Sequence, residues 1–255
     1  LVGVPVLQLK ADKIKVAINT ADSKGRVIDY KAKNMVIPVG LDLSGAVTVG
    51  LGGEYIMDLD GKNGETIQLE ITNALFALDG FLYVGGNFAI KKGFVSGVIM
   101  GTDNPLAAIP VVGGLFEDKT SFDYFSIAAS DVDIFLGFNG PYFGEGDPRN
   151  PTDGDTPVGI FAHDIDFAMG LFTEKEAQPG AKKRKLTAVQ AHVAEVGIVG
   201  FGDILKANFK DVDIMYNNTA KDRYNLFETW IDFEKSFPAA DGKPVGLAMA
   251  TGGPP

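Results

Sequence analysis

A ten-residue pattern of aspartates and aliphatic residues occurs three times in the chain and restricts the folds available to it. The copies are AASDVDIFLG at 128–137, FAHDIDFAMG at 161–170 and NFKDVDIMYN at 208–217. Side chains of a β-strand alternate between its two faces, so Val132, Ile134 and Leu136 are expected to point one way. Asp133 is expected to point the other way. Each copy is therefore predicted to be a strand with one buried face.

The spacing of the copies indicates a repeated architecture with looped insertions. Asp131 and Asp164 are 33 positions apart (164 − 131), and Asp164 and Asp211 are 47 apart (211 − 164). The longer interval contains TEKEAQPGAKKRK at 173–185, a polar insertion expected outside the core. Looser copies lie at 12–18, 34–37 and 73–80. Chance matches among the Asp-flanked strands of any all-β protein remain the alternative explanation.

The composition favours an all-β fold. The 255 residues include 32 glycines and 18 phenylalanines, as expected where tight turns separate strands that bury aromatic rings. Only 218–230 and parts of 104–120 are expected to form short helices. The prediction is a β-solenoid or an extended β-sheet module, with a β-sandwich as the alternative. It forms one elongated unit over 1–255, expected to be a segment of a longer chain.

Charge and residue usage exclude several classes of function. The formal net charge of −10 opposes binding of nucleic acid or anionic lipid by the bulk surface. No stretch of 18 apolar residues is present, so no membrane span is expected. The absence of cysteine excludes disulfides and thiolate metal sites. His163 and His192 are the two histidines, too few for a multi-histidine metal site, and both are interpreted as structural.

Two segments resemble repeat modules of very long bacterial secreted or cell-surface proteins. The first runs from DIFLGFNGPYFGEGDPRNPTDGDTPVGIFAHDIDFAMGLF to KLTAVQAHVAEVGIVGFGDILKANFKDVDIMYN. The second comprises LSGAVTVG at 43–50 and FLYVGGNFAIKKG at 81–93. The resemblance covers about two-thirds of the chain and includes no catalytic motif. It implies an adhesive or filament-forming surface protein without enzymatic activity.

Two acidic turns are candidate calcium sites, since calcium prefers six to eight hard oxygen ligands from a loop that can fold around it. The loop EGDPRNPTDGD provides Glu145, Asp147, Asn150, Asp153 and Asp155. The turn DLDGKNGE provides Asp58, Asp60, Asn63 and Glu65. Neither has EF-hand spacing, and a solvated turn is the alternative for both.

No catalytic or nucleotide-binding motif is present. The glycine-rich pieces at 50–53 and 197–203 are not followed by a helical pattern, as phosphate sites require. The basic cluster KKRK at 182–185 is interpreted as a solvated loop. The paired aspartates of the repeats are interpreted as a solvent face or an interstrand ladder, not as general acid and base.

The predicted function is therefore that of a structural component of an extracellular surface layer, adhesin or filament. It would act by strand pairing and module contacts with copies of itself or neighbouring modules of the same chain. Calcium-dependent adhesion or binding of surface glycans is the first alternative. A carbohydrate-active enzyme with Tyr142, Phe143 and Trp230 lining a groove is the second.

Overall fold

The structure is a computed structural model of the 255-residue chain. It describes residues 7–32, 35–39, 53–57, 59–62, 64–78, 81–109, 118–150, 156–176, 182–202, 204–222, 224–238, 247 and 251. Within these residues nearly all regular structure is β-strand, which confirms the prediction of an all-β fold.

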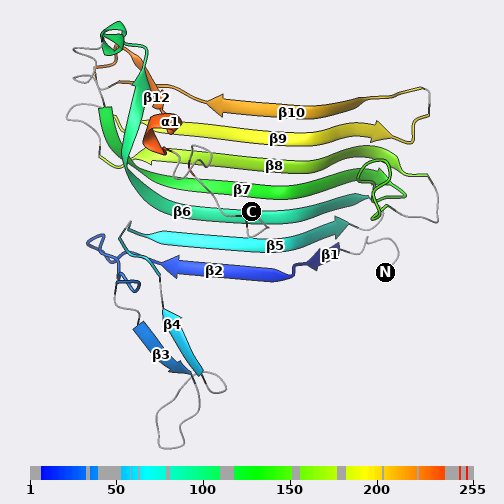
Figure 1. Ribbon diagram of the computed structural model, residues 1–255, viewed down its shortest axis with the longest axis horizontal. Coiled ribbons are helices and arrows are strands. Elements are labelled where there is room, and N and C mark those ends of the chain that lie inside the picture. Colours follow the sequence, from blue (N-terminus) through cyan, green and yellow to red (C-terminus); the bar gives the residue numbers. More distant parts are fainter. Residues whose placement is uncertain are drawn as a thin grey trace, which may run out of the picture.

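One open antiparallel sheet of ten strands organises the molecule (Figure 1). Its main path is β1, β5, β6, β7, β8, β9 and β10, with β2 pairing along β5 beyond β1. The path from β5 to β10 is a meander, so the architecture is the extended sheet among the predicted alternatives. The bounds are β1 Leu7–Lys10, β2 Lys13–Asn19, β5 Thr66–Leu78, β6 Leu82–Thr102, β7 Asp118–Phe138, β8 Val158–Glu174, β9 Lys185–Val199 and β10 Asn208–Asn217.

Shorter elements complete the described part of the chain. Two of them pair with each other and join β6: β11 Ala220–Lys221 and β12 Glu228–Ile231. A separate two-stranded sheet consists of β3 Met35–Val39 and β4 Gly53–Met57. The helices are the 3-10 turn η1 Pro105–Ala108 and the single turn α1 Phe233–Ser236. None of the described helices is long and apolar enough to cross a membrane.

The expected helix at 218–230 is wrong, whereas η1 lies within the other expected region. The segment 218–230 contains β11 and β12, because Trp230 and Ile231 pair with the end of β6. The helical turn begins just after them, where the Asp232 side chain accepts a hydrogen bond from the backbone N–H of Lys235 at 3.0 Å. Such a cap favours the start of a helix at that point.

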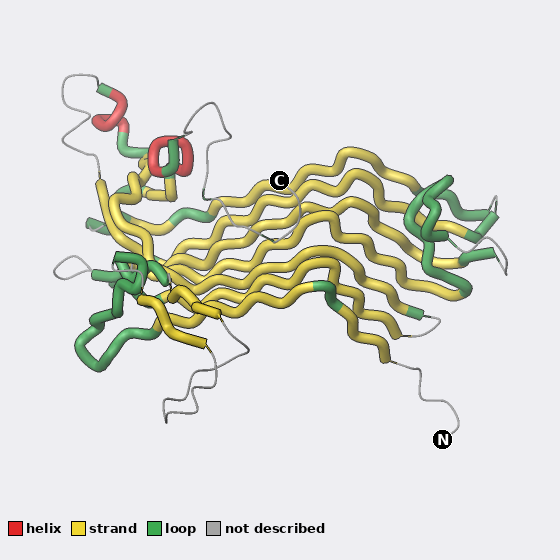
Figure 2. The backbone as a smooth tube through the Cα atoms, turned by 60° about the horizontal axis from the view of Figure 1, so that its bottom comes forward, coloured by secondary structure: helices red, strands yellow, loops and turns green. Residues whose placement is uncertain are grey.

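The hydrophobic core lies on one side of the sheet, named here the covered face and marked by Phe122, Tyr124 and Phe135 of β7 and Phe161 of β8. At one end of the strands, α1 and β12 pack on this face. The core there comprises Val98, Met100, Phe122, Tyr124, Phe172, Leu186 and Ile231. At the other end, the loop after β7 folds onto the same side of the sheet (Figure 2). Both coverings therefore protect one face.

The basic cluster at 182–185 and the adjoining insertion are not entirely solvated, contrary to the sequence interpretation. The guanidinium of Arg184 is buried and lies 2.8 Å from the carboxylate of Glu174, which is also buried. Asp118 accepts a further hydrogen bond from Arg184 at 2.7 Å. A basic residue can be buried in this way when carboxylates compensate its charge. The pattern of four basic residues does not reveal which of them has such partners.

Candidate functional site

A line of backbone irregularities crosses the sheet near the middle of its strands. Register shifts occur between Ile71 and Ala74, between Gly85 and Asn87, and between Ala129 and Val132. Left-handed backbone angles accompany the line at Asn73 (φ 48°), Asp131 (φ 51°), Asp164 (φ 52°) and Asp211 (φ 52°). Asn and Asp tolerate this conformation better than other residues with a Cβ.

The three copies of the decapeptide place their first aspartate on this line. Asp131, Asp164 and Asp211 lie in β7, β8 and β10, each as a positive-φ residue. The break between β1 and β2, at Ala11 and Asp12, continues the line at the opposite edge. The repeated pattern thus marks equivalent positions in the sheet.

In the β7 copy, the buried face beyond Val132 is the reverse of what the aliphatic residues suggest, although Val132 itself is buried. The β10 copy has no buried residue, so the prediction of one buried face for each copy is wrong there. Asp133 and Phe135 point to the covered face and are 5% and 0% exposed. Ile134 is half-buried and Leu136 is exposed, on the other side. The predicted alternation holds from Asp133 to Phe138 but not between Val132 and Asp133, which follow the left-handed Asp131 and are both buried. The loop that covers Asp133 could not be placed from the period of the pattern.

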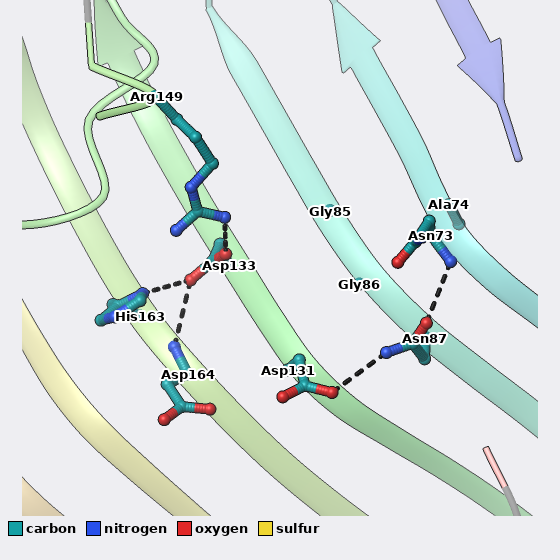
Figure 3. A pocket seen from close by; sticks show the side chains of 10 residues that line it. All are labelled: Asn73, Ala74, Gly85, Gly86, Asn87, Asp131, Asp133, Arg149, His163 and Asp164. Atoms are coloured by element: carbon teal, nitrogen blue, oxygen red, sulfur yellow. Dashed lines mark hydrogen bonds and ion pairs between the residues drawn. The ribbon is translucent and has the colours of Figure 1, made fainter. Parts of the chain in front are cut away.

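A shallow pocket of about 500 Å³ lies on the covered face along the line (Figure 3). Its polar lining comes from four strands and the loop after β7. The lining comprises Asn73, Ala74, Gly85, Gly86, Asn87, Asp131, Asp133, Arg149, His163 and Asp164. Most of these polar groups hydrogen-bond to one another, as the dashed lines in Figure 3 show.

Asp133 is the centre of this network. Its carboxylate receives the Nη1 group of Arg149 and Nδ1 of His163, and it accepts the backbone N–H of Asp164 at 3.1 Å. Its side chain is only 8% exposed. A buried carboxylate with three partners has little capacity left for a ligand, so Asp133 is best explained as an anchor.

Arg149 fastens the loop after β7 to the sheet. Its guanidinium also lies 2.7 Å from a carboxylate oxygen of Asp147 and 4.3 Å from the ring centroid of Phe143. The hydrogen bonds from Arg149 lower the pKa of Asp147 to about 2, although partial burial opposes the shift. Asn150 closes the loop by accepting the backbone N–H of Phe143 at 2.8 Å and donating to the carbonyl of Gly144 at 2.6 Å.

The first calcium candidate therefore has its best oxygens engaged within the protein. Asp147 bonds Arg149, and the Asn150 oxygen bonds the loop backbone. Glu145 is exposed beside them. Asp153 and Asp155 lie outside the described residues. Calcium binding by this loop stays a prediction.

The residues of the second calcium candidate are only partly described. Asp58 and Asn63 lie outside the described residues. Asp60 caps its own turn by accepting the N–H of Lys62 at 2.9 Å. Glu65 forms an ion pair with Lys92 of β6, and this bond lowers the pKa of Glu65. Across the described ranges, no group of three or more His, Asp or Glu side chains is arranged to hold a metal ion.

Both histidines bond aspartates across neighbouring strands. His163 contacts Asp133, and Nδ1 of His192 lies 2.9 Å from Asp213. The Asp213 hydrogen bond raises the pKa of His192. These contacts agree with the interpretation of the histidines as structural.

The aromatic residues proposed to line a carbohydrate groove are not brought together. Tyr142 packs edge-on against Phe161 at 5.0 Å, and Phe143 is buried beneath Arg149. Trp230 lies in β12 at the other end of the sheet, opposite Gly101. The three rings thus belong to two separate coverings of the sheet.

The opposite side of the sheet, named here the open face, is apolar across its width. Opposed residues of an antiparallel sheet share a face, so the strand registers define rows that run from edge to edge. One row comprises Val16, Leu69, Ile90, Ile127, Met169, Val189 and Tyr216. A second comprises Ile14, Ile71, Phe88, Ala129, Phe167, Ala191 and Ile214. Two further rows, also apolar, contain Leu136 with Ile160 and Ile134 with Phe209.

The covered face has the opposite character between its two ends. Next to the open-face row from Val16 to Tyr216, the covered face carries the row Lys15, Glu70, Ala89, Ala128, Ala168, Gln190 and Met215. Small and polar residues are thus on the side that carries the coverings, whereas large apolar residues are on the side where the described elements place no covering. Ile160 remains 52% exposed and Leu171 42% exposed. Sequence reasoning missed this surface because period two shows alternation and not which face is covered.

Comparison of the chain with protein-family models, with curated proteins and with solved structures finds no match.

Proposed function

We propose that the chain is a structural module of an extracellular surface layer, adhesin or filament, which assembles by strand pairing at the edge of its sheet. The observation that carries this proposal is the outer edge of β10. Among the described residues, β10 pairs with β9 alone, so its other side presents backbone groups along ten residues. Such an edge can accept another strand by main-chain hydrogen bonding.

The side chains of β10 suit an added strand. All of its residues except Val212 are exposed. Ile214 and Tyr216 project from the open face, and Met215, 79% exposed, projects from the other. A partner strand would therefore cover apolar surface on both sides of the new pair.

The opposite edge is better protected against addition. Lys13 and Lys15 occupy alternate positions of β2, and lysines on an edge strand oppose its pairing with a strand of another chain. Lys15 also bonds Glu70 of β5 at 3.3 Å, which holds it beside the sheet. Assembly is thus proposed to start from β10.

The extracellular setting rests on the resemblance of the sequence to modules of bacterial surface proteins. A structural role, without catalysis, is supported by the candidate polar site, where Asp133 is saturated by internal partners. The calcium alternative has less support, since Arg149 binds the loop carboxylate that a cation would need.

The test introduces positive charge on the outer edge of β10. Met215→Lys places a positive charge on the outer strand without touching the core or the open face. Negative-stain images and light scattering of the full chain should show higher assemblies for the unmodified protein and at least a tenfold loss for this variant. Met215→Leu is the matched control and should assemble normally. Equal assembly by the two variants would exclude β10 as the pairing edge.

A further inference from the structure

We propose that two copies of this chain pack through their open faces, forming a two-sheet sandwich. The inference deepens the proposed function and rests on it, because it names the partner of a second surface of the same module. The edge of β10 and the open face are separate surfaces, so each can be tested with the other intact.

The open face has the area that a stable dimer needs. Seven strand positions lie side by side, which corresponds to a width of about 29 Å at the usual strand spacing. The apolar stretch of β7 from Phe125 to Phe138 is about 45 Å long at the usual rise per residue. Two such faces bury in total on the order of 2,000 Å² or more, which is the range of stable and obligate interfaces.

The charge distribution on the open face favours a like partner. In the registers of the described strands, its charged residues lie towards the end that carries Phe94. There Lys92 pairs with Glu65, and Lys175 lies 3.6 Å from Asp123. The apolar rows between this end and the other are uncharged. Two copies can therefore meet without burying an unpaired charge.

A second copy explains these features better than a lipid surface does. The net charge of −10 opposes an anionic membrane, and the charges at the boundary are of both signs. Two sheets packed face to face at about 10 Å interdigitate the large aliphatic and aromatic side chains that this face presents. The same self-complementary patch on both subunits closes a two-fold dimer.

The experiment uses a cross-strand pair of the two central strands β7 and β8, near the end of the face where β7 finishes. Leu136 and Ile160 are opposed in β7 and β8 and are both exposed. The double variant Leu136→Lys with Ile160→Glu charges the face while allowing an ion pair within each monomer. Leu106→Lys with Leu226→Glu makes the same chemical change at two exposed positions outside the face. Circular dichroism and thermal melting check that each double variant folds.

Analytical ultracentrifugation at micromolar concentration uses chains that carry Met215→Lys, so that edge pairing is removed. It should give a dimer of Met215→Lys alone and of Met215→Lys combined with the Leu106 and Leu226 changes. The dissociation constant of the dimer should be at least a hundredfold higher when Leu136→Lys and Ile160→Glu are introduced. Retention of the dimer by the Leu136 and Ile160 variant would overturn the face-to-face proposal. A monomeric Met215→Lys chain would also overturn it, since edge pairing would then be the sole contact. A monomeric unmodified chain that instead binds vesicles of phosphatidylcholine would overturn the second-copy proposal and assign the face to lipid.

Discussion

Asp133 and Asp166 occupy reciprocal positions across the β7–β8 pair. Asp133 accepts the backbone N–H of Asp164 at 3.1 Å, and Asp166 accepts that of Asp131 at 3.3 Å. Each strand thus uses the second aspartate of its repeat to bond the left-handed first aspartate of its neighbour. The Asp-x-Asp pattern has a structural explanation in these two bonds, since a bulge otherwise leaves backbone groups without ladder partners.

Replacement of the buried member of this pair should be costly. Asp133→Asn removes the charge that faces Arg149 and His163, and we expect a loss of about 2–3 kcal/mol in the free energy of unfolding. Asp213→Asn is the control, because Asp213 contacts His192 but is 67% exposed. It should cost less than about 0.5 kcal/mol. Urea unfolding at pH 7 measures both, and equal effects would contradict the anchoring role of Asp133.

Adding a single methyl group on the line of backbone irregularities should lower the stability of the protein. A Cβ at Gly86 would lie 2.8 Å from the Cα of Val132, at a backbone φ of 145°. At Gly85 the nearest atom to a Cβ is the carbonyl oxygen of Ala74 at 3.7 Å. We therefore expect Gly86→Ala to lower the free energy of unfolding by more than about 2 kcal/mol. Gly85→Ala should have at most half that effect, as measured by thermal and urea unfolding. Similar losses of stability in the two variants would show that the backbone at Gly86 can shift to make room for a Cβ.

The buried ion pair at the other end should make stability depend on pH. Burial alone raises the pKa of Glu174, but hydrogen bonds from Arg184 outweigh it and leave the pKa below its ordinary value. The stabilisation is therefore complete above the unfolded pKa near 4.5 and decreases as pH falls through the folded value. Glu174→Gln should cost about 3 kcal/mol at pH 7 and progressively less below pH 4.5. Urea unfolding from pH 7 to pH 3 tests this, and a constant difference would contradict it.

The loop after β7 should remain fastened in mild acid. The pKa of Asp147 is about 2 against an ordinary value of 3.8, so its contribution is present above 3.8 and disappears as pH falls towards 2. Pepsin, which cleaves beside aromatic residues, should cut near Phe143 faster in Asp147→Asn than in the unmodified chain at pH 4. At pH 2 the two should be cleaved alike. Glu145→Gln is the control with the same change of charge at an exposed neighbour, and it should resist cleavage at pH 4.

Calcium should have little effect on thermal stability. Because Arg149 and the loop backbone occupy Asp147 and Asn150, 5 mM calcium is expected to change the melting temperature by less than about 1 °C relative to EDTA. Differential scanning calorimetry in the two buffers is the measurement. A rise of several degrees would support calcium-dependent adhesion instead.

The strands themselves were predictable because period-two alternation is a local property. It located parts of β7 and β8 and the whole of β10 from the copies at 128–137, 161–170 and 208–217. Each of these features depends on residues that are close in sequence.

The site was less predictable because its contacts are distant in sequence. Arg149 reaches Asp133 from a loop 16 residues away, and Arg184 meets Asp118 across 66 positions. The pattern of Asp and Asn in the loop suggested cation ligands, whereas an arginine within the same loop provides the positive charge. The covered face could not be assigned for the same reason, since Thr251 reaches Ser130 from the far end of the chain.

The line of left-handed aspartates also bears on what can join the molecule. A strand that docks along β10 meets a left-handed residue at Asp211. The neighbouring β9 shows what such a strand needs, because it pairs along β10 without a register shift and without a left-handed non-glycine residue of its own. The free edge is therefore open to a regular strand along its length.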